Sequence, residues 1–113
     1  MARDRFIWWI FKKPSKDEIE KLLLFYLNNY ENKEWIVEWD YALERWFCTL
    51  KPESGRVKAD LPEGWLDPAD WFEVCLSEDC LDIITRQASK HVNDVADRFA
   101  RICQKKFKGT LDI

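Results

Sequence analysis

The stretch FIWWIF, residues Phe6 to Phe11, places six large apolar residues in a row near the start of a chain in which 35% of the residues are charged. A membrane span needs about 20 apolar residues, and this run stops at Lys12-Lys13-Pro14. A secretion signal would continue into small residues, whereas Ser15 to Glu20 read SKDEIE, the start of a helix. The run therefore predicts a strand in the sheet interior, apolar on both faces and paired along both edges.

A helix is predicted next, at about residues 16–31. Ser15 and Glu18 have the spacing of a capping box, in which each side chain bonds the backbone N–H of the other residue. Leu24 widens the apolar face and is the residue we most expect to meet a partner. Phe25 widens it as well. The residues of the stripe itself recur at helical spacing and are Ile19, Leu22, Leu23, Tyr26, Leu27 and Tyr30.

The period then changes from helical to two, which predicts two neighbouring strands at residues 35–39 and 46–50. Residues 40–44 contain no glycine, so we expect a wide loop or a bulge between these strands and not a tight two-residue turn. The following segments are predicted as a turn at 51–55, a short edge strand at 56–61, a loop at 62–70 and the last strand at 71–76.

A long final helix is predicted at about residues 80–107, capped by Ser77 or Asp79 and stopped by Gly109. At 1.5 Å per residue it would be about 40 Å long and would cross the whole domain. The chain of 113 residues fits one domain, residues 1–113. The predicted fold class is α+β, a mostly antiparallel sheet of four to five strands with two helices, in the order β-α-β-β-(β)-β-α.

The four cysteines do not form a metal-binding pattern. Cys48, Cys75, Cys80 and Cys103 contain no C-x-x-C pair, and Cys80 and Cys103 would lie about 34 Å apart on the predicted final helix. We therefore expect reduced thiols, no metal and no cofactor, in a cytoplasmic protein without a secretion signal.

A catalytic site is the first alternative to a binding function. The only histidine, His91, lies beside the apolar stripe of the predicted final helix, and a thiol from Cys48 or Cys75 would have to reach it. A lone histidine on such a stripe is more often structural. Phosphate-binding loops, zinc-protease motifs and nucleophile elbows are absent from the sequence. We therefore expect a binding function more than a catalytic one.

Charge is divided unevenly along the chain. Residues 60–82 contain eight acids and no lysine or arginine, while the remainder has a net charge of plus five. Large aromatic residues and prolines lie in the same segment. We interpret it as an acidic loop that steers and anchors a basic protein partner; its candidate contact residues are Glu63, Trp65, Asp67, Asp70 and Trp71. The opposing interpretation is a solvated loop whose acids favour the following helix N-terminus, with Trp65 folded onto the core.

Two other partners are weighed against this one. Basic residues gather near the end of the predicted final helix, but cations are favoured at any helix C-terminus, and an isoelectric point near 5.2 argues against nucleic acid. Self-association would favour a symmetric homodimer over a head-to-tail contact. The sequence thus predicts a protein-binding module with no membrane segment, most concretely an inhibitor or immunity-type protein that neutralises a basic target. The basic residues are Arg98, Arg101, Lys105, Lys106 and Lys108.

Overall fold

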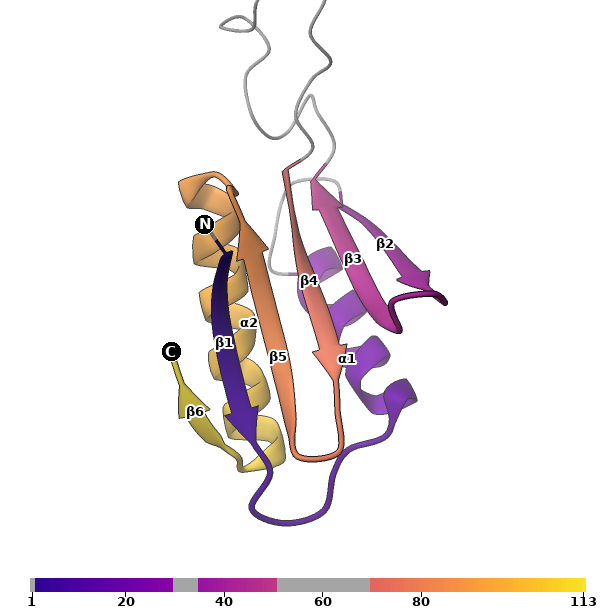
Figure 1. Cartoon of the computed structure of the whole chain (residues 1–113), viewed down its shortest axis with the longest axis vertical. Helices are drawn as coiled ribbons and strands as arrows, with labels where there is room; N and C mark the ends of the chain where they lie inside the picture. The colour runs from indigo at the N-terminus through magenta and orange to yellow at the C-terminus, as the bar shows by residue number, and fades with distance from the viewer. Residues whose placement is uncertain (1, 30–34, 51–69) are drawn as a thin grey trace, which may run out of the picture.

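The computed structural model describes residues 2–29, 35–50 and 70–113. These residues form an α+β fold with two helices and six antiparallel strands (Figure 1), so the predicted fold class is confirmed, with a larger sheet. In chain order the elements are β1 (Ala2–Trp8), α1 (Lys16–Asn29), β2 (Trp35–Asp40), β3 (Arg45–Leu50), β4 (Asp70–Leu76), β5 (Cys80–Arg86), α2 (Lys90–Phe107) and β6 (Thr110–Asp112).

The strands lie side by side in the order β2-β3-β4-β5-β1-β6, and each pairs antiparallel with its neighbours. The middle four strands of the sequence are neighbours in space, which antiparallel hairpin connections allow. β1 enters the sheet between β5 and the short β6. The edge strand β6, near the end of the chain, thus pairs with its first strand.

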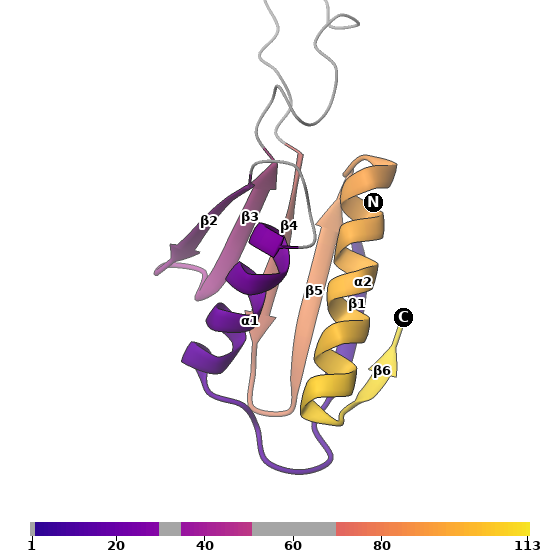
Figure 2. The same ribbon diagram turned by 180° about the vertical axis from the view of Figure 1, so that it is seen from behind.

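Both helices pack on the same face of the sheet (Figure 2), which we call the covered face. The opposite face, called the open face, has neither helix on it (Figure 1). The hydrophobic core lies between the covered face and the helices. Its largest buried side chains include Trp46, Tyr26, Phe72, Phe99 and Ile7.

The apolar run from Phe6 to Phe11 is only partly in a strand, because β1 ends at Trp8. Phe6 to Trp8 are paired on both edges, by β5 and β6, as predicted. Ile10 and Phe11, however, lie beyond the strand and are 61% and 73% exposed. The prediction of a strand buried on both faces is wrong, because helices cover only one face and the chain must leave the sheet to begin α1.

The first helix follows its sequence signals. Ser15 Oγ accepts the Glu18 N–H at 3.1 Å, and Glu18 Oε1 accepts the Ser15 N–H at 3.3 Å, which is the predicted capping box. Leu24 and Phe25 are 40% and 54% exposed. Of the predicted core stripe, Leu22 is half-buried and Tyr30 lies outside the described residues, and the other four are buried, namely Ile19, Leu23, Tyr26 and Leu27.

The two strands predicted after α1 are confirmed as β2 and β3, joined by a turn. Asp40 Oδ1 accepts the N–H groups of Ala42 and Leu43, both at 2.9 Å, and Glu44 has a positive φ of 53°. The strand predicted at 71–76 is confirmed as β4, although two more strands follow it. The predicted turn at 51–55, edge strand at 56–61 and most of the loop at 62–70 lie outside the described residues.

The prediction of one long helix at 80–107 is wrong. Residues 80–86 form β5, and α2 begins only at Lys90, capped by Ser89, whose Oγ accepts the Val92 N–H at 3.2 Å. Neither Ser77 nor Asp79 caps a helix. The β-branched residues of β5 fit a pleated sheet and alternate across it, so this segment pairs with β4 and β1. The 18 residues of α2 span about 27 Å.

A buried arginine fixes α2 to the sheet. The Arg5 side chain is wholly buried on the covered face, and its Nε donates to Asp97 of α2. Its other nitrogens donate to Asn93 Oδ1 at 2.9 Å and to Thr85 Oγ1 at 3.1 Å. A buried charge with this many partners holds a defined geometry.

No helix in the described parts of the chain is long and apolar enough to cross a membrane.

Candidate binding surface

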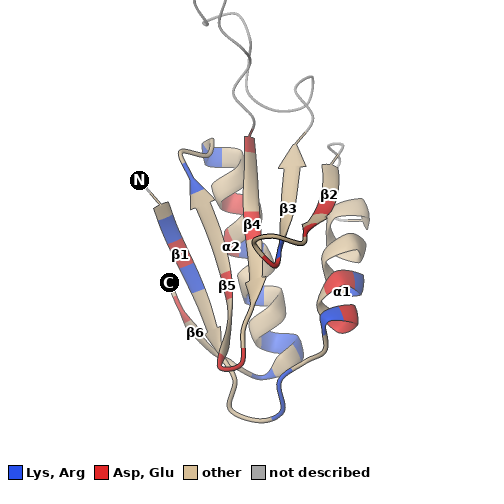
Figure 3. Cartoon of the chain, turned by 45° about the vertical axis from the view of Figure 1, so that its right-hand side comes forward, with Lys and Arg blue, Asp and Glu red and all other residues tan. Residues whose placement is uncertain are grey.

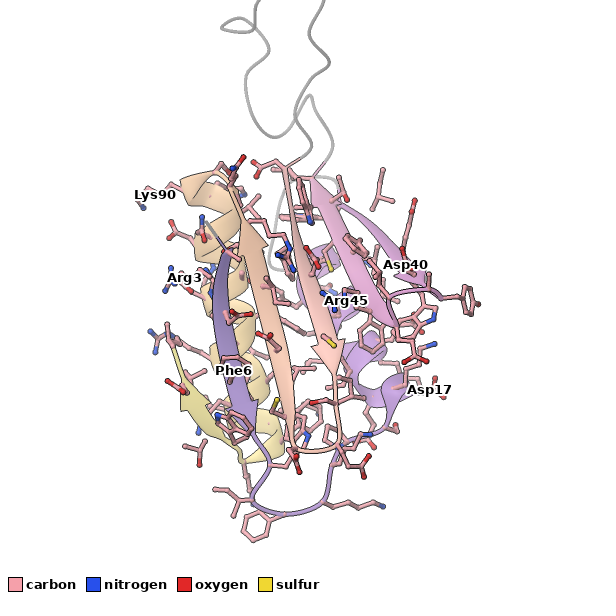
Figure 4. The ribbon with its side chains drawn as sticks, in the orientation of Figure 1. Arg3, Phe6, Asp17, Asp40, Arg45 and Lys90 are labelled. Carbon is pink, nitrogen blue, oxygen red and sulfur yellow. The ribbon has the colours of Figure 1, made fainter. Side chains whose placement is uncertain are left out.

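The open face is formed by alternate residues of the strands, because successive side chains of a strand point to opposite sides of the sheet. Figure 4 looks onto this face, with Phe6, Arg45 and Asp40 labelled on three of its strands. The strand registers place on it Ala2, Asp4, Phe6, Trp8, Ile36, Glu38, Asp40, Arg45, Phe47, Thr49, Trp71, Glu73, Cys75, Cys80, Asp82, Ile84, Arg86, Thr110 and Asp112.

Acids outnumber bases on this surface. The charged groups come from several strands, as the red and blue segments of Figure 3 show. Among the described residues the open face has six acids and two arginines, so its formal charge is negative. The acids are Asp4, Glu38, Asp40, Glu73, Asp82 and Asp112, and the bases are Arg45 and Arg86.

Glu73 binds both arginines of the open face. Its Oε1 accepts from Arg45 Nη1 at 2.9 Å, and its Oε2 accepts from Arg86 Nε at 2.8 Å. Trp71 Nε1 also donates to Oε2, at 3.1 Å. Burial raises the pKa of Glu73, but these three hydrogen bonds outweigh burial and hold its pKa below the ordinary value. Because the arginines neutralise a buried acid, the remaining acids give this face its sign.

Two carboxyl groups of the open face, Asp4 on β1 and Asp82 on β5, lie within hydrogen-bond distance of each other. Burial, followed by the hydrogen bond and negative charge of Asp4, raises the pKa of Asp82 to about 7. Two carboxyl groups at hydrogen-bond distance are stable only when one keeps a proton. Cys75 lies opposite Asp82 in the register, and burial raises the pKa of its thiol as well. Near neutral pH it is therefore Asp82 that changes the charge of this part of the face.

Aromatic side chains lie at both sides of the open face. Phe6 and Trp8 of β1 stack with their ring centroids 5.5 Å apart, and Trp8 is 42% exposed. On the opposite side, a hollow over β2 and β3 is lined by Glu38, Trp39, Asp40, Phe47 and Thr49. The surface thus combines apolar area with unneutralised acids.

The five residues predicted as contacts of the acidic loop have three different outcomes. Glu63, Trp65 and Asp67 lie outside the described residues. Asp70 is buried, 3% exposed, and its Oδ1 accepts the Ser89 N–H at 3.0 Å, so it holds the segment before α2. Trp71 lies half-buried on the open face, where it donates to Glu73. Of the predicted contact residues that are described, only Trp71 therefore lies on this surface.

The structure separates Cys75 from His91, two members of the predicted Cys/His pocket. Cys75 lies on the open face, whereas His91 belongs to α2, on the other side of the sheet. Cys48 is on the covered face, wholly buried, and burial raises its pKa well above the ordinary thiol value. That shift disfavours the thiolate, which is the nucleophilic form.

The cysteine argument used for metal needs correction at one point. Cys80 and Cys103 are not on one helix, because Cys80 belongs to β5. All four cysteines are free thiols. In the described ranges, no three or more His, Cys, Asp or Glu side chains gather in a way that could hold a metal ion.

The open face was missed in the sequence although a signal for it exists. Glu38 stands between Val37 and Trp39, and Glu73 stands between Phe72 and Val74, which is the alternation of a sheet with one solvated face. Comparisons of the chain with protein-family models, with curated proteins and with solved structures found no match.

Proposed function

We propose that the protein binds a basic protein partner on the open face of its sheet. The observation that carries this proposal is the charge of that face: both of its described arginines bind the buried Glu73, while Asp4, Glu38 and Asp112 are exposed on the same face. The most concrete version is an inhibitor or immunity-type protein that neutralises a basic target. The four free thiols fit a reducing compartment, and we place the interaction in the cytoplasm.

Electrostatics supports a role in steering. Asp4, Glu38 and Asp112 are exposed and lie on three different strands, so their field spreads over the whole face. Surface potentials of this kind raise association rates for an oppositely charged partner and weaken with salt, since the Debye length is about 8 Å at physiological ionic strength.

Aromatic side chains supply the anchoring that steering lacks. Trp8 is 42% exposed and stacks on Phe6, which gives a rigid apolar platform at one side of the acidic face. Tryptophan is enriched among residues whose truncation weakens binding most. Glu63, Trp65 and Asp67 of the predicted acidic loop remain candidate contacts in this proposal, although they lie outside the described residues.

A charge-neutralising pair of variants tests the proposal. The face variant Glu38→Gln/Asp112→Asn removes two exposed acids from the open face, and the control variant Asp17→Asn/Asp79→Asn removes two exposed acids elsewhere. Partners captured from extract of the source cells are identified by mass spectrometry, and the purified partner is then tested for association rate at low and high salt.

We expect a partner of high isoelectric point. The face variant should associate several-fold more slowly than the control variant at low salt, and the difference should shrink at about 0.5 M salt. Equal association rates for the two variants at low salt would contradict the proposal.

A further inference from the structure

One edge of the sheet is a long strand without a neighbour on its outer side. β2 pairs only with β3 among the described residues, in a continuous register from Trp35 opposite Leu50 to Asp40 opposite Arg45. Figure 1 shows no described element beyond it. The opposite edge is the three-residue β6. Of the two edges, β2 therefore offers the longer row of backbone N–H and C=O groups.

Natural proteins usually protect such an edge with lysine, proline, a bulge or a very short strand. β2 has the sequence WIVEWD and contains neither lysine nor proline, and its register with β3 has no bulge. What it presents instead is negative charge on one side. Glu38 is exposed and Asp40 is half-buried, both on the open face.

These acids discriminate between strands that could pair with the edge. If two copies of β2 paired antiparallel with Glu38 at the centre, Glu38 of one copy would face Glu38 of the other, and in a register shifted by two residues it would face Asp40. Like charges directly opposite each other destabilise strand pairing, and opposite charges stabilise it. The edge therefore disfavours a second copy of this chain and favours a strand with basic residues.

We propose that β2 accepts an extended basic segment of the partner as a seventh, antiparallel strand. This inference rests on the proposed function, because it specifies how the basic partner is held. Lysine or arginine at alternate positions would face Glu38 and Asp40, and apolar residues between them would lie on the side of Val37. Backbone hydrogen bonds would provide affinity and the alternate side chains specificity, as in other strand additions.

The hollow beside β2 suits a basic side chain. Phe47 lies opposite Glu38 in the register, so an aromatic ring and a carboxylate adjoin each other there. A lysine stem packs on apolar surface while its ammonium group remains near the acid. Asp40 is fixed in position by accepting the N–H groups of Ala42 and Leu43.

A set of short peptides tests strand addition. The probe is acetyl-Thr-Lys-Val-Lys-Val-Lys-Thr-amide, compared with a version that has glutamate for lysine. Two further versions have backbone N-methyl groups, one on its lysines and the other on its valines. In an added edge strand only alternate residues point their N–H groups at the sheet. One N-methylated version should therefore lose binding at least tenfold, and the other should stay within about threefold of the probe.

NMR of the isotope-labelled protein locates the probe. We expect the largest amide shifts in β2 and β3, and small shifts in β6. Glu38→Lys should weaken the lysine probe about fivefold and strengthen the glutamate version, whereas Asp79→Lys, at an exposed acid outside the open face, should change neither.

The outcomes separate this inference from the proposed function. If the lysine probe binds and both N-methylated versions bind equally well, strand addition is overturned and binding through side chains on the open face stands. A lysine probe that does not bind also overturns strand addition, and the capture experiment above then judges the proposed function. If the glutamate version binds as tightly as the lysine probe, both proposals fail.

Discussion

Glu73→Gln is the substitution that most directly probes how the open face is built. Glu73 is 3% exposed, although it lies on the face that no described helix covers. Its two oxygens accept hydrogen bonds from Arg45, Arg86 and Trp71. Glutamine keeps the size of the side chain and one acceptor oxygen but removes the charge. We therefore expect this variant to fold with reduced stability.

The size of the loss follows from the exposure of the partners. Hydrogen bonds to charged groups contribute about 1.5–3 kcal/mol when buried. The Arg86 side chain is 46% exposed, so its share falls toward the roughly 0–1 kcal/mol of surface pairs. Arg45 is 22% exposed and can regain part of its hydration. We expect a loss of about 2 kcal/mol, which lowers the Tm by about 8 °C at about 2.1 cal/mol/K of unfolding entropy per residue.

The loss should depend on pH with a defined sign. Because the net effect of its surroundings lowers the pKa of Glu73 in the folded protein, its contribution is complete above the unfolded value of about 4.3. It disappears as pH falls through the lower folded value. The difference between parent and variant should therefore be largest at pH 7 and shrink toward pH 3.5.

Urea unfolding followed by tryptophan fluorescence measures this difference. Glu38→Gln is the matched control, since it neutralises an exposed acid of the same face, and we expect its stability to lie within about 0.5 kcal/mol of the parent. A Glu73→Gln variant as stable as this control at pH 7 would refute the reasoning. A loss that stays constant down to pH 3.5 would assign the effect to packing and not to charge.

Three further outcomes are expected. The pKa of Asp82 is raised to about 7, so between about pH 4 and pH 7 the folded state keeps a proton that the unfolded state releases, and stability falls as pH rises through this range. Asp82→Asn should therefore stabilise the protein by about 1 kcal/mol at pH 8, after allowing for solvent screening. Urea unfolding should show that this advantage is lost by pH 4. Gly109→Ala should destabilise by about 1–3 kcal/mol in thermal unfolding, because its Cβ would lie 2.5 Å from Ile7 Cγ2. A thiol reagent should modify half-buried Cys75 in the native protein and reach Cys48 only on unfolding; equal rates at both would contradict their assigned positions.

Local signals in the sequence were sufficient for several elements. The capping box at Ser15 and Glu18 marks the start of α1, and the period of two marks β2, β3 and β4. These signals depend on residues near one another in the chain, whose conformational preferences act before any tertiary contact forms. The class of the fold follows from counting such elements.

The failures concern segments whose state depends on distant partners. Residues 80–86 contain apolar residues at spacings compatible with either a helix or a strand, and pairing with β4 and β1 decides for the strand. The run from Phe6 to Phe11 is apolar throughout, yet its last residues are exposed because the chain leaves the sheet there. Short apolar runs are ambiguous until the rest of the core is in place.

In the candidate site, too, some features follow from the sequence and others depend on tertiary contacts. The sequence by itself determined that the protein has a negative segment, several large aromatic residues and alternating acids such as Glu38 and Glu73. Only the tertiary structure decided that these acids share one face, since that face is assembled from six strands far apart in the chain. It also decided that Asp70 is buried, because its carboxylate accepts a backbone N–H from the segment before α2. Charge is a property of single residues, whereas the surface on which charges gather is set by strand order and by the side on which the helices pack.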